Sequence, residues 1–259
     1  MEHLIDFVKE LSFVRVGGSP QEKQAAELIL QKVREISASA RRNDIHPKVL
    51  PFQIPDADVK KCVVTAAGRE ISSTPFLCSG NIDRECRLLY LDDATEIDSA
   101  RDASLYPKEL REQYRRNGVI PGFWITAADA AALLNEEVET IHLTLEQEEK
   151  AVESQNLLVE LKGTDRAEES IVLTAHYDSV PVGTGSWDNA TGATALLAIF
   201  DYFVAHPSRR TLLFLWCGSE EKGLLGSRAF GKVLERCSIQ RFSVLLLLRN
   251  SGTGIKPWD

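Results

Sequence analysis

SIVLTAHYD, residues 170–178, and TLLFLWCG, residues 211–218, are two apolar segments of strand length. A segment with helical character, residues 190–204, separates them, and a second such segment at 222–236 leads to a third apolar run, FSVLLLL, at 242–248. Continuous apolar strands that alternate with helices are typical of a sheet that is covered on both faces. We therefore expect an α/β fold with a mixed, largely parallel sheet sandwiched by helices.

The chain before residue 151 divides into two further parts. Apolar residues at helical spacing predict helices within residues 1–36, and Ser19-Pro20 is typical of a helix start, with Ser19 as the cap. Strand-like and helix-like runs between residues 85 and 145 predict a separate small module. We expect N-terminal helices with the start of the main domain, an inserted α/β module, and the core of the main domain, at residues 1–84, 85–150 and 151–259.

The composition argues against several classes of partner. A net charge of −8 does not suit a nucleic-acid-binding protein, because phosphate binding needs a basic surface. The amino-terminal residues lack a cationic start followed by an apolar run, and the longest apolar run, residues 244–248, is too short to span a bilayer. The five cysteines form no CxxC pair, which favours reduced thiols. We expect a cytoplasmic protein with no signal peptide and no membrane partner, and the sequence does not indicate its oligomeric state.

His176 and Asp178 stand at the end of the strand IVLTAH, in the sequence HYD. Residues two apart on a strand face the same way, so the two side chains share one side of the sheet. A neutral imidazole can bind zinc through one nitrogen while the other nitrogen donates to a carboxylate. The alternative for an isolated H-x-D is a structural hydrogen-bonded pair, since buried histidines are often satisfied in this way.

Further acidic residues follow the ends of these strands. Asp188 lies in a glycine-rich loop that begins at the His176 strand and leads into a helix, where the alternative role is an N-cap. Glu220 and Glu221 follow a wholly apolar strand, and adjacent carboxylates repel each other unless a cation or a proton intervenes. Their alternative is a solvated first helical turn. Because open α/β folds place their sites at the carboxyl ends of strands, we expect these side chains to converge there.

Three ordered motifs carry a family resemblance. AHYDSV at 175–180, GSWDNATG at 185–192 and SEEKGLLGS at 219–227 resemble the M28 family of zinc aminopeptidases. HYDSVP also resembles the M20 peptidases and deacylases, in which the bridging Asp lies much farther from the first His. The short spacing in this chain, together with DNATG, favours M28.

The M28 resemblance implies a role for each matched residue. His176 would bind one zinc, Asp188 would bridge two zincs, and Glu221 would bind the other. Glu220 would be the general base that deprotonates the metal-bridging water, and Asp178 would orient His176. Two metals that share a water lower its pKa and polarise the scissile carbonyl, so the implied chemistry is coherent. Similar ligands also suit cobalt and manganese.

A second, weaker resemblance concerns the small module. RRNGVIPGFWITAADAAALL at 115–134, followed by ESQNLLVELKG at 153–163, resembles the protease-associated insert of some M28 members. The resemblance implies a module that shapes or covers the cleft. The alternative is an α/β insert with no function of its own, because a fold does not fix a function.

The chain departs from the M28 pattern after the glutamates. The family has an Asp, within a pattern such as N-x-D, at the end of the next strand, where SVLLLLRNSGTG at 243–254 offers Leu, Arg and Asn. A later His ligand would fall beyond Asp259. Each metal would keep two protein ligands, whereas catalytic zinc normally has three. We expect a chain that is truncated or frameshifted near Leu247, with RNSGTGIKPWD outside the family sequence. Nothing in their spacing supports substitutes at His142, His206 or Asp259.

The function we expect is a two-zinc metallopeptidase that removes amino-terminal residues from peptides. One alternative is a catalytically impaired or inactive M28-like protein, either a peptide-binding pseudoenzyme or a truncated product. Another is a related deacylase or glutaminyl cyclase.

Overall fold

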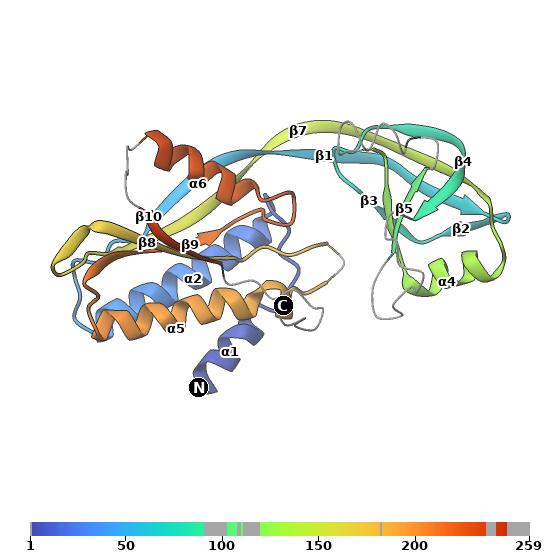
Figure 1. Ribbon diagram of the computed structural model, residues 1–259. Helices are drawn as coiled ribbons and strands as arrows, with labels where there is room; N and C mark the ends of the chain where they lie inside the picture. The colour runs from blue at the N-terminus through green and yellow to red at the C-terminus, as the bar shows by residue number, and fades with distance from the viewer. Residues whose placement is uncertain are drawn as a thin grey trace, which may run out of the picture. The chain divides into compact units, whose positions relative to one another are not determined.

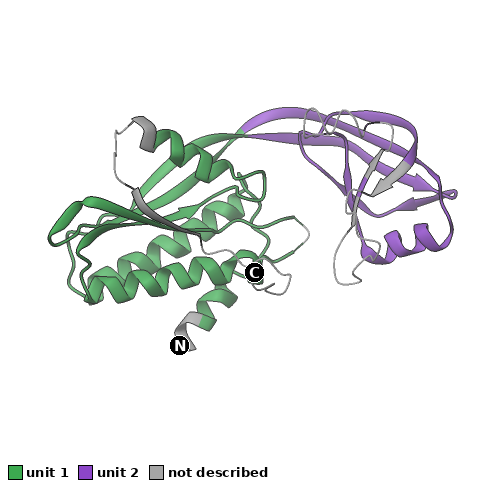
Figure 2. Ribbon diagram, in the orientation of Figure 1, with its two compact units in different colours: residues 1–54, 152–259 green, residues 55–151 purple. Residues whose placement is uncertain are grey.

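The computed structural model describes residues 2–90, 103–107, 110, 120–181, 183–236 and 242–247. It divides into two compact units, shown in different colours in Figure 2. Unit 1 comprises Met1–Ile54 and Val152–Asp259, and unit 2 comprises Pro55–Ala151. The candidate site lies in unit 1.

The sheet of unit 1 is mixed. β8 (Arg166–His176) pairs in parallel with β9 (Arg210–Cys217) and with β10 (Phe242–Leu247), and the carboxyl-terminal part of β7 (Thr140–Leu161) pairs antiparallel with β9. The α/β class with a mixed sheet and flanking helices is confirmed. Among the described residues, the parallel pairs are those of β8 with β9 and with β10, so the sheet is parallel around the site and not largely parallel as a whole.

Helices cover both faces of this sheet (Figure 1). α1 (Glu2–Glu10), α2 (Pro20–Ser39) and α5 (Thr191–Ala205) cover one face, and α6 (Leu225–Arg236) covers the other. Alternate residues of β8 serve the two cores, because side chains of a strand alternate between faces. Leu173 and Ala175 belong to the core under α2 and α5, whereas Val172 packs with Phe230 of α6. Helices on both faces exclude water from these apolar strands.

The start of α2 follows the prediction. Ser19 is the N-cap residue, and its hydroxyl accepts a hydrogen bond of 3.1 Å from the backbone N–H of Glu22. Pro20 occupies the first turn, where its missing N–H has no intrahelical partner to lose. The predicted helix start at Ser19-Pro20 is therefore confirmed.

The described residues of unit 2 form an antiparallel sheet together with the helix α4 (Ala127–Asn135). The sheet contains most of β1 (Lys48–Ala66) and the amino-terminal part of β7, and α4 belongs to the same core. Buried residues such as Leu143 and Phe123 fill this core. The remaining strands of unit 2 are β2 (Arg69–Ile71), β3 (Ser73–Pro75), β4 (Ile82–Tyr90), β5 (Ala103–Pro107) and β6 (Phe123–Ile125).

β7 differs from the prediction. The sequence indicated two strands on either side of a boundary near residue 150, but one strand runs from Thr140 to Leu161. Its middle residues, 148–151, are all exposed. Unit 2 also starts earlier than residue 85, at Pro55, because β1 continues into it. The comparison of residues 85–150 with a protease-associated insert stays a prediction.

Candidate metal centre

His176 is the last residue of β8 and is almost fully buried. Its Nε2 lies 2.9 Å from Asp188 Oδ1 and 3.8 Å from Glu220 Oε2. Its Nδ1 lies 3.3 Å from Asp178 Oδ1, an ion-pair contact and not a well-formed hydrogen bond. The predicted same-side placement of His176 and Asp178 is therefore observed. One ring nitrogen faces a buried carboxylate and the other faces the acidic cluster, which is the usual arrangement of a metal-binding histidine.

Asp178 connects the two strand ends. Its side chain is fully buried, and its two carboxylate oxygens accept hydrogen bonds of 2.9 and 3.1 Å from the backbone N–H groups of Glu220 and Glu221. Asp178 thus holds the turn after β9 against the end of β8, so the simple alternative of an isolated His–Asp pair does not describe it.

Asp188 does not cap α5. Its backbone angles are not helical, and its carboxylate turns to His176. The capping hydrogen bond comes from the next residue, because Asn189 Oδ1 accepts from the N–H of Gly192 at 3.0 Å. A cis peptide bond joins Asp188 to Asn189. The N-cap alternative for Asp188 is therefore wrong, and the capping function belongs to its neighbour.

Glu220 and Glu221 lie in the turn between β9 and α6. The turn closes through hydrogen bonds from the N–H groups of Gly223 and Leu224 to the carbonyl of Glu220, and α6 begins only at Leu225. The alternative of a first helical turn is therefore wrong. Ligand-type atoms of His176, Glu220 and Glu221 all lie within 4.8 Å of one another, which is close enough for one metal ion.

Electrostatics show a shortage of positive charge at this cluster. Burial raises the pKa of Glu221 to about 7, and the nearby carboxylates of Asp188 and Asp178 add to the rise, while His176 acts to lower it. Burial acts to lower the pKa of His176, but its contacts with Asp178 and Asp188 raise it to about 10. Both groups therefore hold protons more strongly than usual. A bound cation would supply the same compensation, so these donors fit a metal ion.

The motifs of this site match a known family. The family model described as Peptidase family M28 matches residues 156–255. The resemblance to family M28 is confirmed. The matched residues contain the whole cluster and extend past residue 248, into the tail that we expected to lie outside the family sequence; the structure of residues 248–259 lies outside the described residues.

Curated relatives match part of this chain. Vacuolar membrane proteases of Saccharomyces cerevisiae are 45% identical over 78 residues, which are 30% of this chain and 8% of the relative. That of Eremothecium gossypii is 36% identical over 104 residues, 40% of this chain and 10% of the relative. The matches therefore span only about a tenth of these relatives' length.

The fold is similar to those of solved aminopeptidases. The structure of a zinc aminopeptidase from Bacillus subtilis aligns with a TM-score of 0.69 and 23% identity, over 97% of this chain and 69% of that one. An aminopeptidase from Aneurinibacillus aligns with a TM-score of 0.63 and 20% identity, over 96% and 70%. These TM-scores show a shared fold. Together with the family match, they support a metallopeptidase.

The predicted cytoplasmic location is wrong. The curated relatives from Saccharomyces cerevisiae, Eremothecium gossypii and Candida albicans are all named vacuolar membrane proteases. The prediction rested on cysteine usage and on the amino-terminal residues, and neither is a direct signal of a compartment. Within the described residues, no helix combines the length and the apolar content that crossing a bilayer would need.

Two buried charged residues escaped the sequence analysis. Arg15 and Glu22 flank the breaker VGGSP, and both are fully buried beside the M28 motifs. The available signal was weak. Glu22 occupies the same helical face as Ala25, Ala26 and Ile29, where a charge is unusual unless it has partners.

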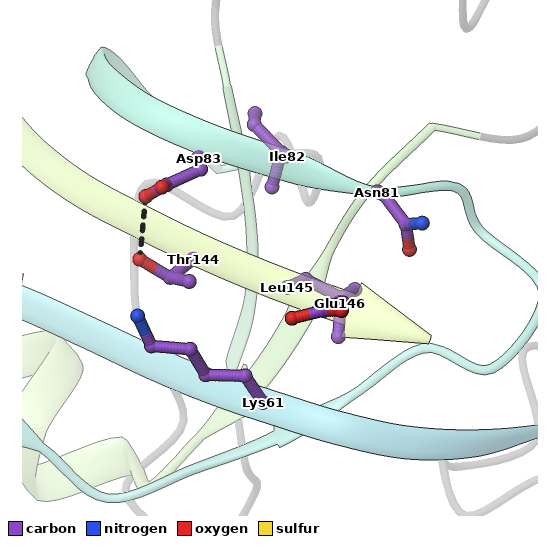
Figure 3. Close-up of a pocket in the computed structure, with 7 residues that line it drawn as sticks. All are labelled: Lys61, Asn81, Ile82, Asp83, Thr144, Leu145 and Glu146. Atoms are coloured by element: carbon purple, nitrogen blue, oxygen red, sulfur yellow. Dashed lines mark hydrogen bonds between the residues drawn. The ribbon is translucent and has the colours of Figure 1, made fainter. Parts of the chain in front are cut away.

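The substitute ligands considered from the sequence do not join the cluster. His206 follows the last residue of α5, at the opposite end of that helix from Asp188, and His142 pairs with Asp83 in unit 2. Asp259 lies outside the described residues. A shallow pocket of about 360 Å³ in unit 2 has walls that include Asp83, whose carboxylate accepts a hydrogen bond from Thr144 (Figure 3). None of the predicted site residues lines this pocket.

Proposed function

We propose that this chain carries the active site of a zinc-dependent aminopeptidase, which hydrolyses peptide bonds at the amino termini of peptides. The observation that carries the proposal is the convergence of His176, Asp188, Glu220 and Glu221 at the ends of β8 and β9. An imidazole with carboxylates, and no thiolate, is the ligand chemistry of hydrolytic zinc sites.

Each residue of the cluster has a role in this proposal. His176, Asp188 and Glu221 would hold zinc, and Asp178 would orient His176 from behind. Zinc bound there would polarise the scissile carbonyl and lower the pKa of a water molecule. Glu220 would accept a proton from the attacking water and deliver it to the leaving amine. Its side chain is 13% exposed, so it is accessible at the edge of the cluster.

The relatives extend the proposal to a compartment. The relatives that match part of this chain are named vacuolar membrane proteases. We infer that this chain acts on peptides in a vacuole-type compartment. In this proposal the substrates are short peptides with a free amino terminus.

A second candidate function follows from the sequence after β10. Leu248, Arg249 and Asn250 stand where the M28 resemblance leads us to expect an N-x-D pattern. A site with fewer protein ligands would bind zinc weakly, since catalytic zinc normally has three. In this reading the chain binds peptides without hydrolysing them. The deacylase and glutaminyl cyclase alternatives predict a different product from the same cluster.

The experiment combines zinc analysis with turnover. Purified full chain should contain zinc and release the aromatic amine from aminoacyl anilides. Glu220→Gln should retain zinc and lose kcat by about 10²–10⁴, because the variant cannot accept a proton. Glu168→Gln, an exposed position on β8, is the matched control and should behave as the wild type.

Three outcomes would contradict the aminopeptidase. Substoichiometric zinc with no turnover would favour the peptide-binding candidate. Hydrolysis of acyl amides but not of aminoacyl substrates would favour a deacylase, and a pyroglutamyl product would favour a cyclase. Full activity of Glu220→Gln would exclude Glu220 as the base.

A further inference from the structure

The segment between α1 and α2 places a buried cation against the loop that carries Asp188. The guanidinium of Arg15 is fully buried and donates to five backbone carbonyls. Two of these, Leu11 and Phe13, belong to its own segment. The other three belong to the end of β8 and the loop after it, and they are the carbonyls of Tyr177, Thr184 at 2.6 Å and Gly185 at 2.8 Å.

These contacts tie the end of β8 to the loop. Tyr177 directly follows His176, and Gly185 lies three positions before Asp188, so a single side chain connects the supports of two predicted ligands. Gly185 has a positive φ of 58°, and a Cβ there would lie 2.9 Å from the Arg15 guanidinium nitrogens. The loop backbone is therefore packed directly on the cation, and the planar fork of arginine matches this set of carbonyls.

The charge of Arg15 is balanced by the site itself. Among the described residues no carboxylate forms an ion pair with Arg15. Burial lowers the pKa of Arg15 to about 10, and the nearby charges of Asp178, Glu221 and Asp188 oppose this. Arg15 thus interacts with the acidic cluster through its charge, while its hydrogen bonds go to the backbone of the loop.

Glu22 makes the complementary arrangement at the turn after β9. One of its oxygens accepts from Ser154 Oγ at 2.9 Å, from the N–H of Ser219 at 3.0 Å and from Ser219 Oγ at 3.2 Å. Its other oxygen accepts from the N–H of Gly18 at 2.7 Å. Ser219 immediately precedes Glu220 and Glu221 and has a φ of 52°, so Glu22 fixes an unusual backbone conformation at the start of the turn.

We propose that Arg15 and Glu22 are positioning residues of the metal site, with Arg15 ordering the loop of Asp188 and Glu22 ordering the turn of Glu220 and Glu221. The inference rests on the proposed metal-binding function. Ligands that are held in place before the metal arrives bind it more tightly, and removal of such supporting contacts typically reduces metal affinity by about 10–100-fold.

Hydrogen–deuterium exchange on the metal-free full chain tests the roles of Arg15 and Glu22 separately. Arg15→Lys keeps the positive charge but loses the planar guanidinium that donates to several carbonyls at once. It should speed exchange in peptides that cover residues 183–189, while peptides that cover residues 218–224 stay protected. Glu22→Ala should give the reverse pattern. Glu22→Gln keeps an acceptor oxygen for Ser154 and Ser219, so it should restore most of the protection.

The control separates positioning from stability. Val33→Ala, a buried position of α2 away from the site, destabilises the same helix and should speed exchange in neither loop preferentially. Zinc affinity, measured by competition with a fluorescent chelator below the melting temperature, should fall by about 10–100-fold in Arg15→Lys and Glu22→Ala but not in Val33→Ala.

The outcomes are distinguishable from those of the proposed function. Equal exchange in both loops of either variant, or unchanged zinc affinity with a loosened loop, would overturn the positioning role. A wild-type chain that binds no zinc would contradict the proposed function, and the exchange pattern would then decide whether Arg15 and Glu22 order the two loops.

Discussion

The loop after β8 and the turn after β9 carry the two arms of the site, and buried groups of opposite charge hold them. The β8 loop presents carbonyls to a cation, Arg15. The β9 turn presents N–H groups to two carboxylates, those of Glu22 and Asp178. Each loop is thus anchored by a buried group whose charge is opposite to the partial charge of the backbone atoms that the loop presents.

The two arms differ in how tightly they are enclosed. The side chain of Asp188 on the β8 loop is 42% exposed, whereas that of Glu220 on the β9 turn is 13% exposed. Around the β9 turn a Cβ on Gly218 would meet three protein atoms at under 3 Å, but one on Gly183 of the β8 loop would meet a single methyl at 3.8 Å. Position 218 should therefore tolerate an added side chain less well than position 183. Within the β8 loop the packing is uneven, because a Cβ on Gly185 would lie 2.6 Å from Ser179 and 2.9 Å from Arg15.

The largest expected effect concerns Glu22, which anchors the β9 turn. Burial raises the pKa of Glu22 to about 7, against a hydrogen bond from Gly18 that acts to lower it. Because the folded pKa exceeds the unfolded value of 4.5, folding takes up a proton, and stability falls as the pH rises from about 4.5 to about 7. Glu22→Gln removes this loss, so its free energy of unfolding relative to wild type should increase by up to about 3 kcal/mol over that window.

Urea denaturation of the metal-free chain at several pH values measures this difference. Glu168→Gln on the exposed face of β8 is the control, and its curve should run parallel to that of the wild type. A Glu22→Gln curve that is also parallel to the wild type would mean that the Glu22 carboxylate is not enclosed in solution.

The glycines of the two loops give a smaller and more local comparison. Gly218→Ala would place a Cβ at 2.5 Å from the carbonyl oxygen of Gln155 and 2.6 Å from Glu22 Oε1, so it should lower the free energy of unfolding by about 1–3 kcal/mol. Gly183→Ala meets only Val180, at 3.8 Å, and should change stability little. Thermal denaturation of both variants decides the point. Equal losses would remove the difference in enclosure.

The sequence predicted the main features of unit 1 because they depend on local patterns. Apolar runs and helical spacing indicated β8, β9 and α5, and the ends of these strands placed His176 and the acidic residues at one edge. Parallel strands bring their carboxyl ends together whatever the details of the loops. For this reason the sheet topology was enough to predict that the strand ends carrying His176 and Glu220 lie close together.

Other features depended on long-range packing and were not readable. The sequence predicted a domain boundary between residues 150 and 151, whereas β7 continues through it as one strand. Asp188 and Asn189 are both good capping residues, and only the three-dimensional loop shows which one caps α5. Arg15 and Glu22 act on partners more than 130 positions away in the chain, which a pattern of neighbouring residues does not reveal.

A substitution at Asp178 tests whether this residue couples the end of β8 to the turn after β9. Asp178 contacts His176 on one arm and the N–H groups of Glu220 and Glu221 on the other. Asp178→Asn keeps the size but replaces one acceptor by a donor, so it should weaken zinc binding by about 10–100-fold. Asp201→Asn, an exposed position on α5, should leave zinc affinity unchanged. Unchanged affinity in Asp178→Asn would mean that the arms are held independently.

The smallest effect concerns the division of roles between the neighbours Asp188 and Asn189. Asn189 caps α5 through Gly192, so Asn189→Ala should lower the free energy of unfolding by roughly 0.5–2 kcal/mol. Asp188→Ala should instead reduce zinc affinity by more than Asn189→Ala does, because its carboxylate faces His176. Chemical denaturation and zinc titration of both variants give the two readouts. If Asp188→Ala lowered the free energy of unfolding more than Asn189→Ala does, the capping residue of α5 would be Asp188 and not Asn189.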